Sequence, residues 1–235
     1  MAKVRLRIGV RMRAVVAVAV LGLGVTACGA ATDAHPADRP LAKLSATLGA
    51  DGTTISVGDA AAKSTVSLHE DMRCPVCRDF EVDGGAPHLA ELARNRKVKI
   101  EYTLASFLDD RVGGSGSKRA VNALRAALEQ NKFVEYHDVL YAHQPEEAID
   151  GFTDAYLLEL ADQVKGLHTP EFEKAVKTMR YKDFVSRSQR AYEHADVPGT
   201  PTMAIDTMQL TGLSYNALFD KEEFKYLMTT VLDAK

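Results

Sequence analysis

Apolar and polar residues alternate along several short segments of the chain, with the period of two that half-buried β-strands show. The clearest segment spans residues 98–104, where every second residue is a large apolar one. In residues 64–71, Val66 and Leu68 share one face of a second predicted strand. Weaker strand candidates are Thr53–Val57, Thr202–Ile205 and Met208–Leu210. The pattern therefore predicts a sheet whose strands come from both ends of the folded part of the chain.

Between these candidates the apolar spacing changes to three and four residues, which is typical of helices. Most of residues 112–180 follow this helical pattern, and Cys77–Asn95 follows it too, with a break at Gly84-Gly85. An apolar stripe over residues 224–232 indicates a final helix. Helix starts are supported by Thr153, by Thr169 before Pro170, and by Asp220 three residues before Glu223. Strands interrupted by helices predict a protein of the α/β class.

The first 27 residues have the pattern of an export signal. They contain five basic residues and no acidic one, and they end in a run from Ala14 to Ala27 of Ala, Val, Leu and Gly with one Thr. A basic start, an apolar run and small residues before a break are the parts of a signal peptide. The run is too short for a membrane span, which needs about 20 apolar residues. A buried helix of the fold is the alternative, but no polar face interrupts the run.

The run ends in Val25-Thr26-Ala27-Cys28, which resembles the lipobox of bacterial lipoproteins. In that family the cysteine is lipidated and becomes the mature N-terminus, so the resemblance implies lipidation of Cys28. Two acyl chains are enough for stable membrane attachment. Ordinary signal cleavage near Ala27, with Cys28 as a spare thiol, is the alternative. Residues 28–50 are rich in small residues and proline and are expected to form a flexible tether.

Composition and charge exclude several classes of protein. The chain has 235 residues, of which 46% are apolar, and a formal net charge of −3, which argues against disorder and against nucleic-acid binding. Removal of the basic leader leaves an acidic mature chain. Three cysteines are too few for a four-cysteine zinc site or a disulfide-rich scaffold. If Cys28 belongs to the anchor, Cys74 and Cys77 are the cysteines of the folded part.

The segment Cys74-Pro75-Val76-Cys77 carries the candidate chemistry. A C-x-x-C pair can be half of a zinc site, a haem attachment site or a redox dithiol. The chain has no second C-x-x-C, and Arg78 rather than histidine follows the second cysteine. A structural disulfide stays open as an alternative, although it closes too short a loop to restrict the unfolded chain much. The position of the motif, after a strand and at a helix start, favours the redox dithiol.

The two cysteines are expected to differ in reactivity. At a helix start, unpaired backbone N–H groups and the helix dipole stabilise a thiolate, so Cys74 is expected to have a lowered pKa. Cys77, one turn further on, is expected to be more buried and to resolve the mixed disulfide. Pro75 and Val76 lie between the cysteines and are expected to tune the redox potential. Arg73, next to Cys74, is expected to favour its thiolate further.

Three stretches of the sequence together resemble the DsbA-like group of thioredoxin-fold proteins, close to its secreted and membrane-anchored Gram-positive members. The stretches are Glu70–Glu81, Phe133–Tyr141 and Gly199–Thr202, and they lie in family order. The resemblance covers roughly residues 53–232. It implies an α/β protein with a thioredoxin fold, a central mixed sheet flanked by helices, and an inserted helical domain.

The resemblance also divides the chain and assigns residues. The expected parts are a lipoprotein-type signal peptide (1–27), a tether (28–50), the first part of the thioredoxin fold (51–111), the inserted helical domain (112–180) and the second part of the fold (181–235). Pro201 is implied to be cis and to face Cys74. The backbone of Thr200 is implied to pair with an extended substrate segment. Cys74, Cys77 and Pro201 are implied to be catalytic.

Two positions depart from the family pattern. Many relatives carry a buried acid six residues before the first cysteine, where this chain has Leu68, and thioredoxins usually have Trp where it has Arg73. Glu70 shares the strand parity of Leu68 and could turn inward in its place. A solvated acid at the strand end is the simpler interpretation, because acids are seldom buried unpaired. His137, on an apolar helical face, is interpreted as a packed histidine rather than a ligand.

These features predict an exported, lipid-anchored thiol:disulfide oxidoreductase, an oxidase by its resemblance. Its expected partners are exported proteins with thiols or disulfides, a separate redox partner and the membrane, without nucleic acid. No metal is expected, and no cofactor beyond the redox-active disulfide Cys74–Cys77. The alternatives are a reductase or isomerase of the same fold and a non-catalytic binding module with an inert disulfide. The expected location is the outer face of the cell membrane or, without lipidation, the medium.

Overall fold

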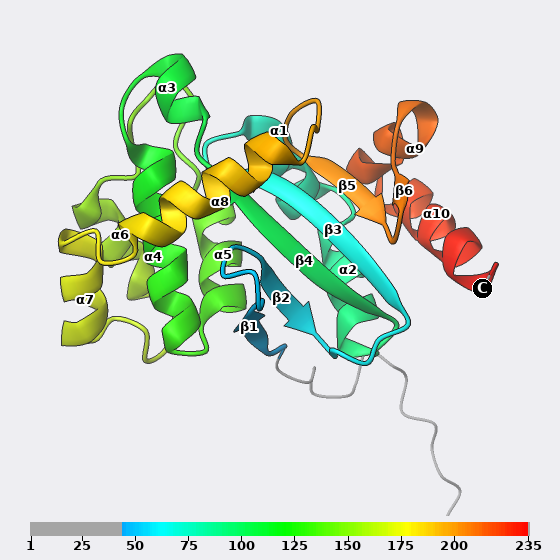
Figure 1. Ribbon diagram of the computed structural model, residues 1–235, viewed down its shortest axis with the longest axis horizontal. Helices are drawn as coiled ribbons and strands as arrows, with labels where there is room; N and C mark the ends of the chain where they lie inside the picture. The colour runs from blue at the N-terminus through cyan, green and yellow to red at the C-terminus, as the bar shows by residue number, and fades with distance from the viewer. Residues whose placement is uncertain (1–43, 235) are drawn as a thin grey trace, which may run out of the picture. The chain divides into compact units, whose positions relative to one another are not determined.

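The alternating segments of the sequence form a six-stranded mixed sheet, which a computed structural model describes together with the rest of residues 44–234 (Figure 1). The strand order is β1-β2-β4-β3-β5-β6. The strands are β1 (Ala46–Leu48), β2 (Ile55–Gly58), β3 (Ser64–Asp71), β4 (Val98–Ala105), β5 (Thr202–Ile205) and β6 (Met208–Gln209). Within this sheet β3 and β4 run parallel, and the other neighbours run antiparallel. The α/β class and the central mixed sheet are confirmed.

The start of the sheet differs from the prediction. Strand β2 begins at Ile55 rather than Thr53, because the Asp51 carboxylate accepts hydrogen bonds from the backbone N–H groups of Thr53 and Thr54 and holds them in a turn. Strand β1 lies inside the predicted tether of residues 28–50, so that prediction is wrong for residues 46–48. Three residues with one buried side chain are too short a pattern to be recognised in the sequence.

The helical pattern is confirmed in outline. The helical segments are α1 (Pro75–Arg78), the π-helical turn η2 (Asp79–Asp83), α2 (Ala86–Arg94), α3 (Leu108–Val112), α4 (Gly116–Glu129), α5 (Phe133–Ala142), α6 (Asp154–Ala161), α7 (Pro170–Lys177), α8 (Lys182–His194), α9 (Gly212–Asn216), the 3-10 turn η3 (Ala217–Phe219) and α10 (Lys221–Asp233). The side chains of Thr153, Thr169 and Asp220 cap α6, α7 and α10 by accepting backbone N–H groups. Each such cap is worth about 1 kcal/mol.

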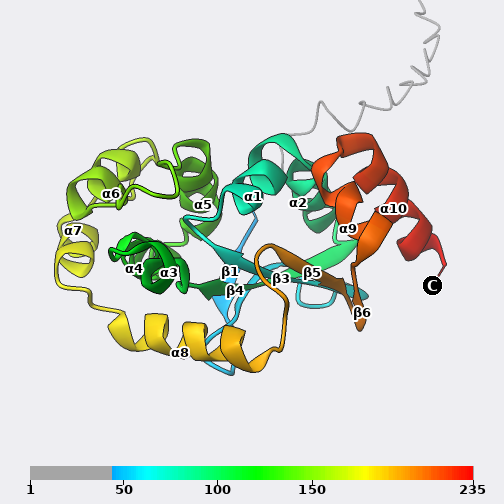
Figure 2. The ribbon, with the colours of Figure 1, turned by 90° about the horizontal axis from the view of Figure 1, so that it is seen from above.

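The helices are distributed around the sheet in two ways. Helix α8 lies along one face, while α1, α2 and α10 lie on the other (Figure 2). Helices α3 to α7, which come between β4 and β5 in the sequence, form a group beside the sheet (Figure 1). Within this group α4 contacts α3, α5, α6 and α7, and outside it α4 also contacts α8. Buried residues of the sheet and of this group belong to one hydrophobic core.

The predicted break at Gly84-Gly85 has a packing reason. A Cβ atom on Gly85 would lie 2.3 Å from the Phe224 ring, and one on Gly84 would lie 2.5 Å from the Leu218 carbonyl oxygen. The bare backbone therefore lets Phe224 of α10 come close and meet the Phe80 ring edge-on, with ring centroids 5.9 Å apart. The last helix is thus held against the segment that follows the two cysteines.

Candidate active site

A tight turn between β3 and α1 presents the two cysteines. Cys74 directly precedes the helix, and its backbone N–H donates to the Asp71 carbonyl oxygen at 2.9 Å. Pro75 takes a position in the first helical turn, where a missing N–H group costs nothing. The structure describes Cys74 and Cys77 as free thiols. Cys28 and the predicted signal peptide lie outside the described residues.

The two thiols differ in burial in the predicted order. Cys74 keeps 7% of its surface exposed, Cys77 is completely buried, and Val76 between them is 38% exposed. Cys74 is thus covered more than an attacking sulfur is expected to be. The exposed part of the pair is therefore the Cys74 sulfur, beside the apolar Val76 side chain.

The surroundings of Cys74 favour its thiolate. The hydrogen bond from the Cys77 thiol is the main cause that lowers the pKa of Cys74, to about 7, and the backbone N–H groups of Cys77 and Val76 act in the same direction, while burial opposes them. Near neutral pH the thiol and the thiolate are therefore both well populated. As the pH falls below 7 the thiolate is lost, and with it the nucleophile.

The surroundings of Cys77 do the opposite. Burial raises the pKa of Cys77 well above its usual value, and its hydrogen bond to Cys74 and the nearby Glu70 carboxyl group raise it further. Cys77 is therefore a thiol at neutral pH. The pKa values of the two thiols therefore differ in the direction that the position of Cys74 at the helix start predicts.

The loop before β5 lies opposite the cysteines. Because β5 pairs with β3, the segment that precedes Thr202 comes next to the carboxyl end of β3. The Thr200–Pro201 peptide bond is cis, as the resemblance implies. The Cys74 thiol donates to the Thr200 carbonyl oxygen, with 3.2 Å between the sulfur and the oxygen. The structure therefore brings Cys74, Thr200 and Pro201 together from positions far apart in the sequence.

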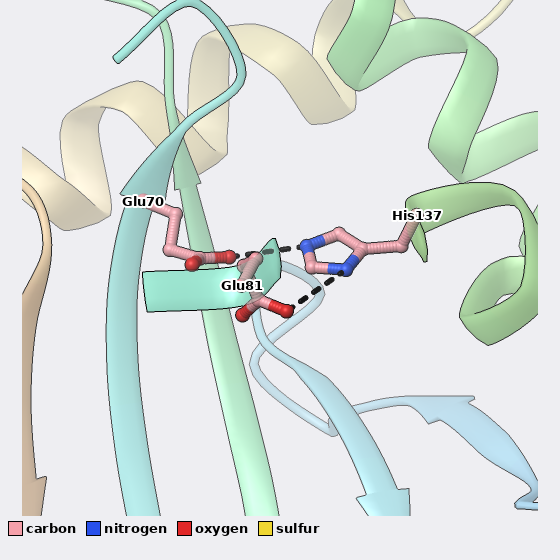
Figure 3. Close-up of side chains that lie close together, drawn as sticks. All are labelled: Glu70, Glu81 and His137. Atoms are coloured by element: carbon pink, nitrogen blue, oxygen red, sulfur yellow. Dashed lines mark hydrogen bonds and ion pairs between the residues drawn. The ribbon is translucent and has the colours of Figure 1, made fainter. Parts of the chain in front are cut away.

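Glu70 is completely buried, so its interpretation as a solvated acid is wrong. It continues the inward face of Val66 and Leu68 on β3, and burial raises the pKa of Glu70 to about 8. Its Oε2 atom lies 3.1 Å from Nε2 of His137 on α5, and the other imidazole nitrogen lies 4.0 Å from an oxygen of Glu81 (Figure 3). The His137 ring is also packed against Tyr102, as a packed histidine is expected to be.

Arg73 does not serve Cys74 in the way its position predicts. Its guanidinium group is buried and forms an ion pair with Asp109 at 2.9 Å. It also donates to the carbonyl oxygens of Gly113 and Glu147, each at 2.7 Å. The positive charge is therefore directed at the helical segment between β4 and β5. Arg73 attaches the cysteine turn to that segment.

Gln144 is a site residue that the sequence does not reveal. Its side-chain amide donates to the carbonyl oxygens of Met72 and Cys74, at 2.9 and 3.0 Å. Two such hydrogen bonds contribute about 1 kcal/mol each. In the sequence, Gln144 precedes Pro145 and two acidic residues, a pattern that predicts an exposed loop. Gln144 reaches the cysteine turn because α5 ends just before it and brings the loop there.

Asp71 is a second residue that organises the turn. Its carboxylate accepts hydrogen bonds from the Ser117 hydroxyl at 2.5 Å, from the Arg73 backbone N–H at 3.0 Å and from the Leu108 backbone N–H at 3.1 Å. Burial nevertheless raises the pKa of Asp71 to about 6. The sequence shows Asp71 only as an acid at the end of a strand. It does not reveal that Leu108 of α3 and Ser117 of α4 donate hydrogen bonds to it.

Residues 50–221 match the sequence profile of a thioredoxin family, described as Thioredoxin. The match spans well over half of the chain, so the protein belongs to the thioredoxin family. A search of curated proteins finds no match.

Several solved structures share the fold. Oxidised BdbD from Bacillus subtilis is 19% identical, with a TM-score of 0.65 over 81% of this chain and 98% of that one. MdbA from Actinomyces oris, a thiol-disulfide oxidoreductase, is 18% identical, with a TM-score of 0.62 over 77% and 86%. Reduced DsbA from Mycobacterium tuberculosis is 19% identical, with a TM-score of 0.56 over 80% and 98%. The fold is therefore the DsbA-like form of the thioredoxin fold.

Proposed function

We propose that this protein is a thiol:disulfide oxidoreductase that exchanges disulfides with protein substrates through Cys74 and Cys77. The observation that carries the proposal is the asymmetry of the pair: Cys74 has a lowered pKa beside the Thr200–Pro201 loop, while Cys77 is buried with a raised pKa. Disulfide exchange needs one reactive thiolate and one protected resolving thiol. The names of structural relatives, such as the thiol-disulfide oxidoreductase MdbA, support the same activity.

The proposed reaction transfers two electrons from a substrate dithiol to the oxidised cysteine pair. A substrate thiolate attacks the Cys74 sulfur, forms a mixed disulfide and releases Cys77, which takes up a proton. A second substrate thiolate then attacks the substrate sulfur of the mixed disulfide and releases Cys74 as a thiolate. The substrate leaves with a disulfide and the protein with a dithiol. In this scheme Thr200 offers its backbone to an extended substrate segment, and Val76 offers an apolar contact.

We propose the oxidising direction on the resemblance to the DsbA-like group. A lowered pKa of Cys74 stabilises the reduced protein and acts in the same direction, but a value of about 7 is also that of thioredoxin and does not set the direction by itself. The reduction potential of the cysteine pair is expected to be higher than that of thioredoxin, which is about −270 mV. Alkylation of Cys74 is expected to reach half of its maximal rate near pH 7. Equilibration with glutathione buffers and the pH dependence of alkylation measure the two values. A potential near that of thioredoxin, with faster insulin reduction than substrate oxidation, would instead make the protein a reductase.

We further propose that the protein is exported and attached to the membrane through a lipid on Cys28, with a separate protein or small molecule reoxidising the cysteine pair. The leader pattern of residues 1–28 supports this proposal. Within residues 44–234 no helix has the length and apolar character to cross a bilayer. In a bacterial host the chain is expected in the membrane fraction, and a Cys28→Ser variant in the medium. The same distribution for both chains would contradict lipidation.

A further inference from the structure

A buried cluster of three polar side chains lies near Cys77. Glu70 comes from β3, Glu81 from η2 and His137 from α5, and their side chains converge in the interior (Figure 3). One nitrogen or oxygen atom from each of the three lies within 4.8 Å of the other two. The cluster contains none of the cysteines, so the C-x-x-C spacing gives no sign of it.

The cluster lacks positive charge. Among residues 44–234 neither carboxyl group forms an ion pair with a lysine or arginine, and the single imidazole of His137 faces both. One oxygen of Glu70 and one of Glu81 are buried without any hydrogen-bond partner. A buried carboxyl group without a compensating cation either costs several kcal/mol as a carboxylate or holds a proton, and a metal ion that binds takes the place of that proton. Two unpartnered oxygens beside an imidazole are therefore a set of ligands for a cation.

We propose that Glu70, Glu81 and His137 bind one divalent transition-metal ion, with Zn²⁺ as the best match. Carboxylate oxygens and an imidazole nitrogen are ligands that Zn²⁺ takes, whereas Ca²⁺ and Mg²⁺ take oxygen alone. Zinc bonds to nitrogen and oxygen are about 2.0–2.2 Å long. The donor atoms, which lie up to 4.8 Å from one another, must therefore move closer together to bind one ion. Binding requires the two glutamate side chains to move closer to the imidazole, which stays in place.

The imidazole is held in place by its neighbours. Its ring centroid lies 5.0 Å from that of Tyr102, 5.5 Å from that of Phe133 and 4.9 Å from that of Tyr141. Packing from three sides limits rotation of the ring and so presents its nitrogens in a fixed direction. A rigid nitrogen ligand with two adaptable carboxylates lowers the cost of assembling a metal site.

The cluster is also accessible. A cavity of about 340 Å³ lies between α2 and α5, and Glu81, His137, Asp138 and Tyr141 are among its lining residues. The Glu81 side chain keeps 7% of its surface exposed, whereas that of Glu70 is fully covered. Burial raises the pKa of Asp138, and Arg94, which also lines this cavity, acts in the opposite direction. The cavity therefore carries charges of both signs, and Glu81 is the more exposed of the two glutamates. Approach to the cluster through this cavity does not pass Cys74.

The test measures binding of Zn²⁺ alone to a full chain in which Cys28, Cys74 and Cys77 are replaced by serine. Without thiols, metal held by the active-site cysteines is excluded, and the result does not depend on disulfide exchange. Equilibrium dialysis with metal analysis is expected to find one Zn²⁺ per chain, and thermal unfolding is expected at a higher temperature with Zn²⁺ present.

In this cysteine-free chain, Glu81→Gln keeps the size of the side chain and removes its charge, and it is expected to weaken Zn²⁺ binding about tenfold or more. Glu91→Gln is the matched control, because Glu91 forms an exposed pair with His88 at 3.3 Å, and it is expected to bind like the parent. His137→Gln provides a second test, and Glu81→Gln decides alone if that variant does not fold. Absence of bound Zn²⁺ in the parent, or equal binding by Glu81→Gln, would overturn the proposal.

Discussion

Replacing Cys74 with serine is expected to abolish disulfide exchange, with a loss of roughly 1,000-fold or more in the rate of substrate oxidation. Serine keeps the size of the side chain but has no thiolate, and Cys77 cannot take over, because it is fully buried and its pKa is raised. The measurement is the rate at which a reduced model protein regains its disulfides. A Cys74→Ser variant with substantial activity would exclude Cys74 as the attacked sulfur.

The matched variant Cys77→Ser separates an enzyme from a binding module. It retains the reactive Cys74 without a resolving thiol, so mixed disulfides with substrate proteins are expected to accumulate on Cys74. Non-reducing gels followed by mass spectrometry detect them, and a Cys74→Ser/Cys77→Ser double variant reveals any adducts formed through Cys28. No adduct on Cys74 in cells would favour a non-catalytic module with an inert disulfide.

Replacing Arg73 with methionine is expected to cost about 3–5 kcal/mol in the free energy of unfolding, because Asp109 is left buried and charged without its cation. The variant also loses the hydrogen bonds to Gly113 and Glu147. Urea unfolding of the reduced proteins measures the difference. Arg73→Lys, which keeps the charge without the forked geometry, is expected to lie between the parent and Arg73→Met.

Arg78, which follows the second cysteine, provides the control for the Arg73→Met variant. Arg78 is 38% exposed and pairs with Asp79 and Asp83 at the surface, so Arg78→Met is expected to cost less than about 1 kcal/mol. The two arginines flank the same four residues and differ mainly in burial. Equal losses for Arg73→Met and Arg78→Met would show that the buried pair does not hold the cysteine turn in place.

The regular elements could be predicted because their patterns are local. The alternation in residues 98–104 and the caps at Thr153, Thr169 and Asp220 depend on neighbours within one or two turns, and the structure confirms them. Strand β1 cannot be recognised in the sequence, because three residues carry no periodicity. The sequence predicts ordinary helix for the π-helical turn η2, because the apolar spacing does not distinguish the two forms.

The residues of the site also differ in how far the sequence predicts them. Cys74, Pro75 and Cys77 lie in one short motif, and the family resemblance implies the place of Pro201 opposite Cys74. The partners of Glu70 and Arg73 could not be predicted, because Glu70 meets His137 across 67 positions of sequence and Arg73 meets Asp109 across 36. Strand parity shows which way Glu70 points but not what lies there. Proximity to Cys74 in sequence was therefore a poor guide to where the Arg73 charge acts.

Gln144 has a consequence for how the protein can be divided. The donor that holds the Met72 and Cys74 carbonyl oxygens comes from the loop that follows α5, outside the sheet and the helices that cover its faces. A minimal domain made by deleting α3 to α7 would keep both cysteines and lose this donor, together with the acceptors of Arg73. The helical segment is therefore part of what holds the cysteine turn in place and not a removable attachment to the sheet.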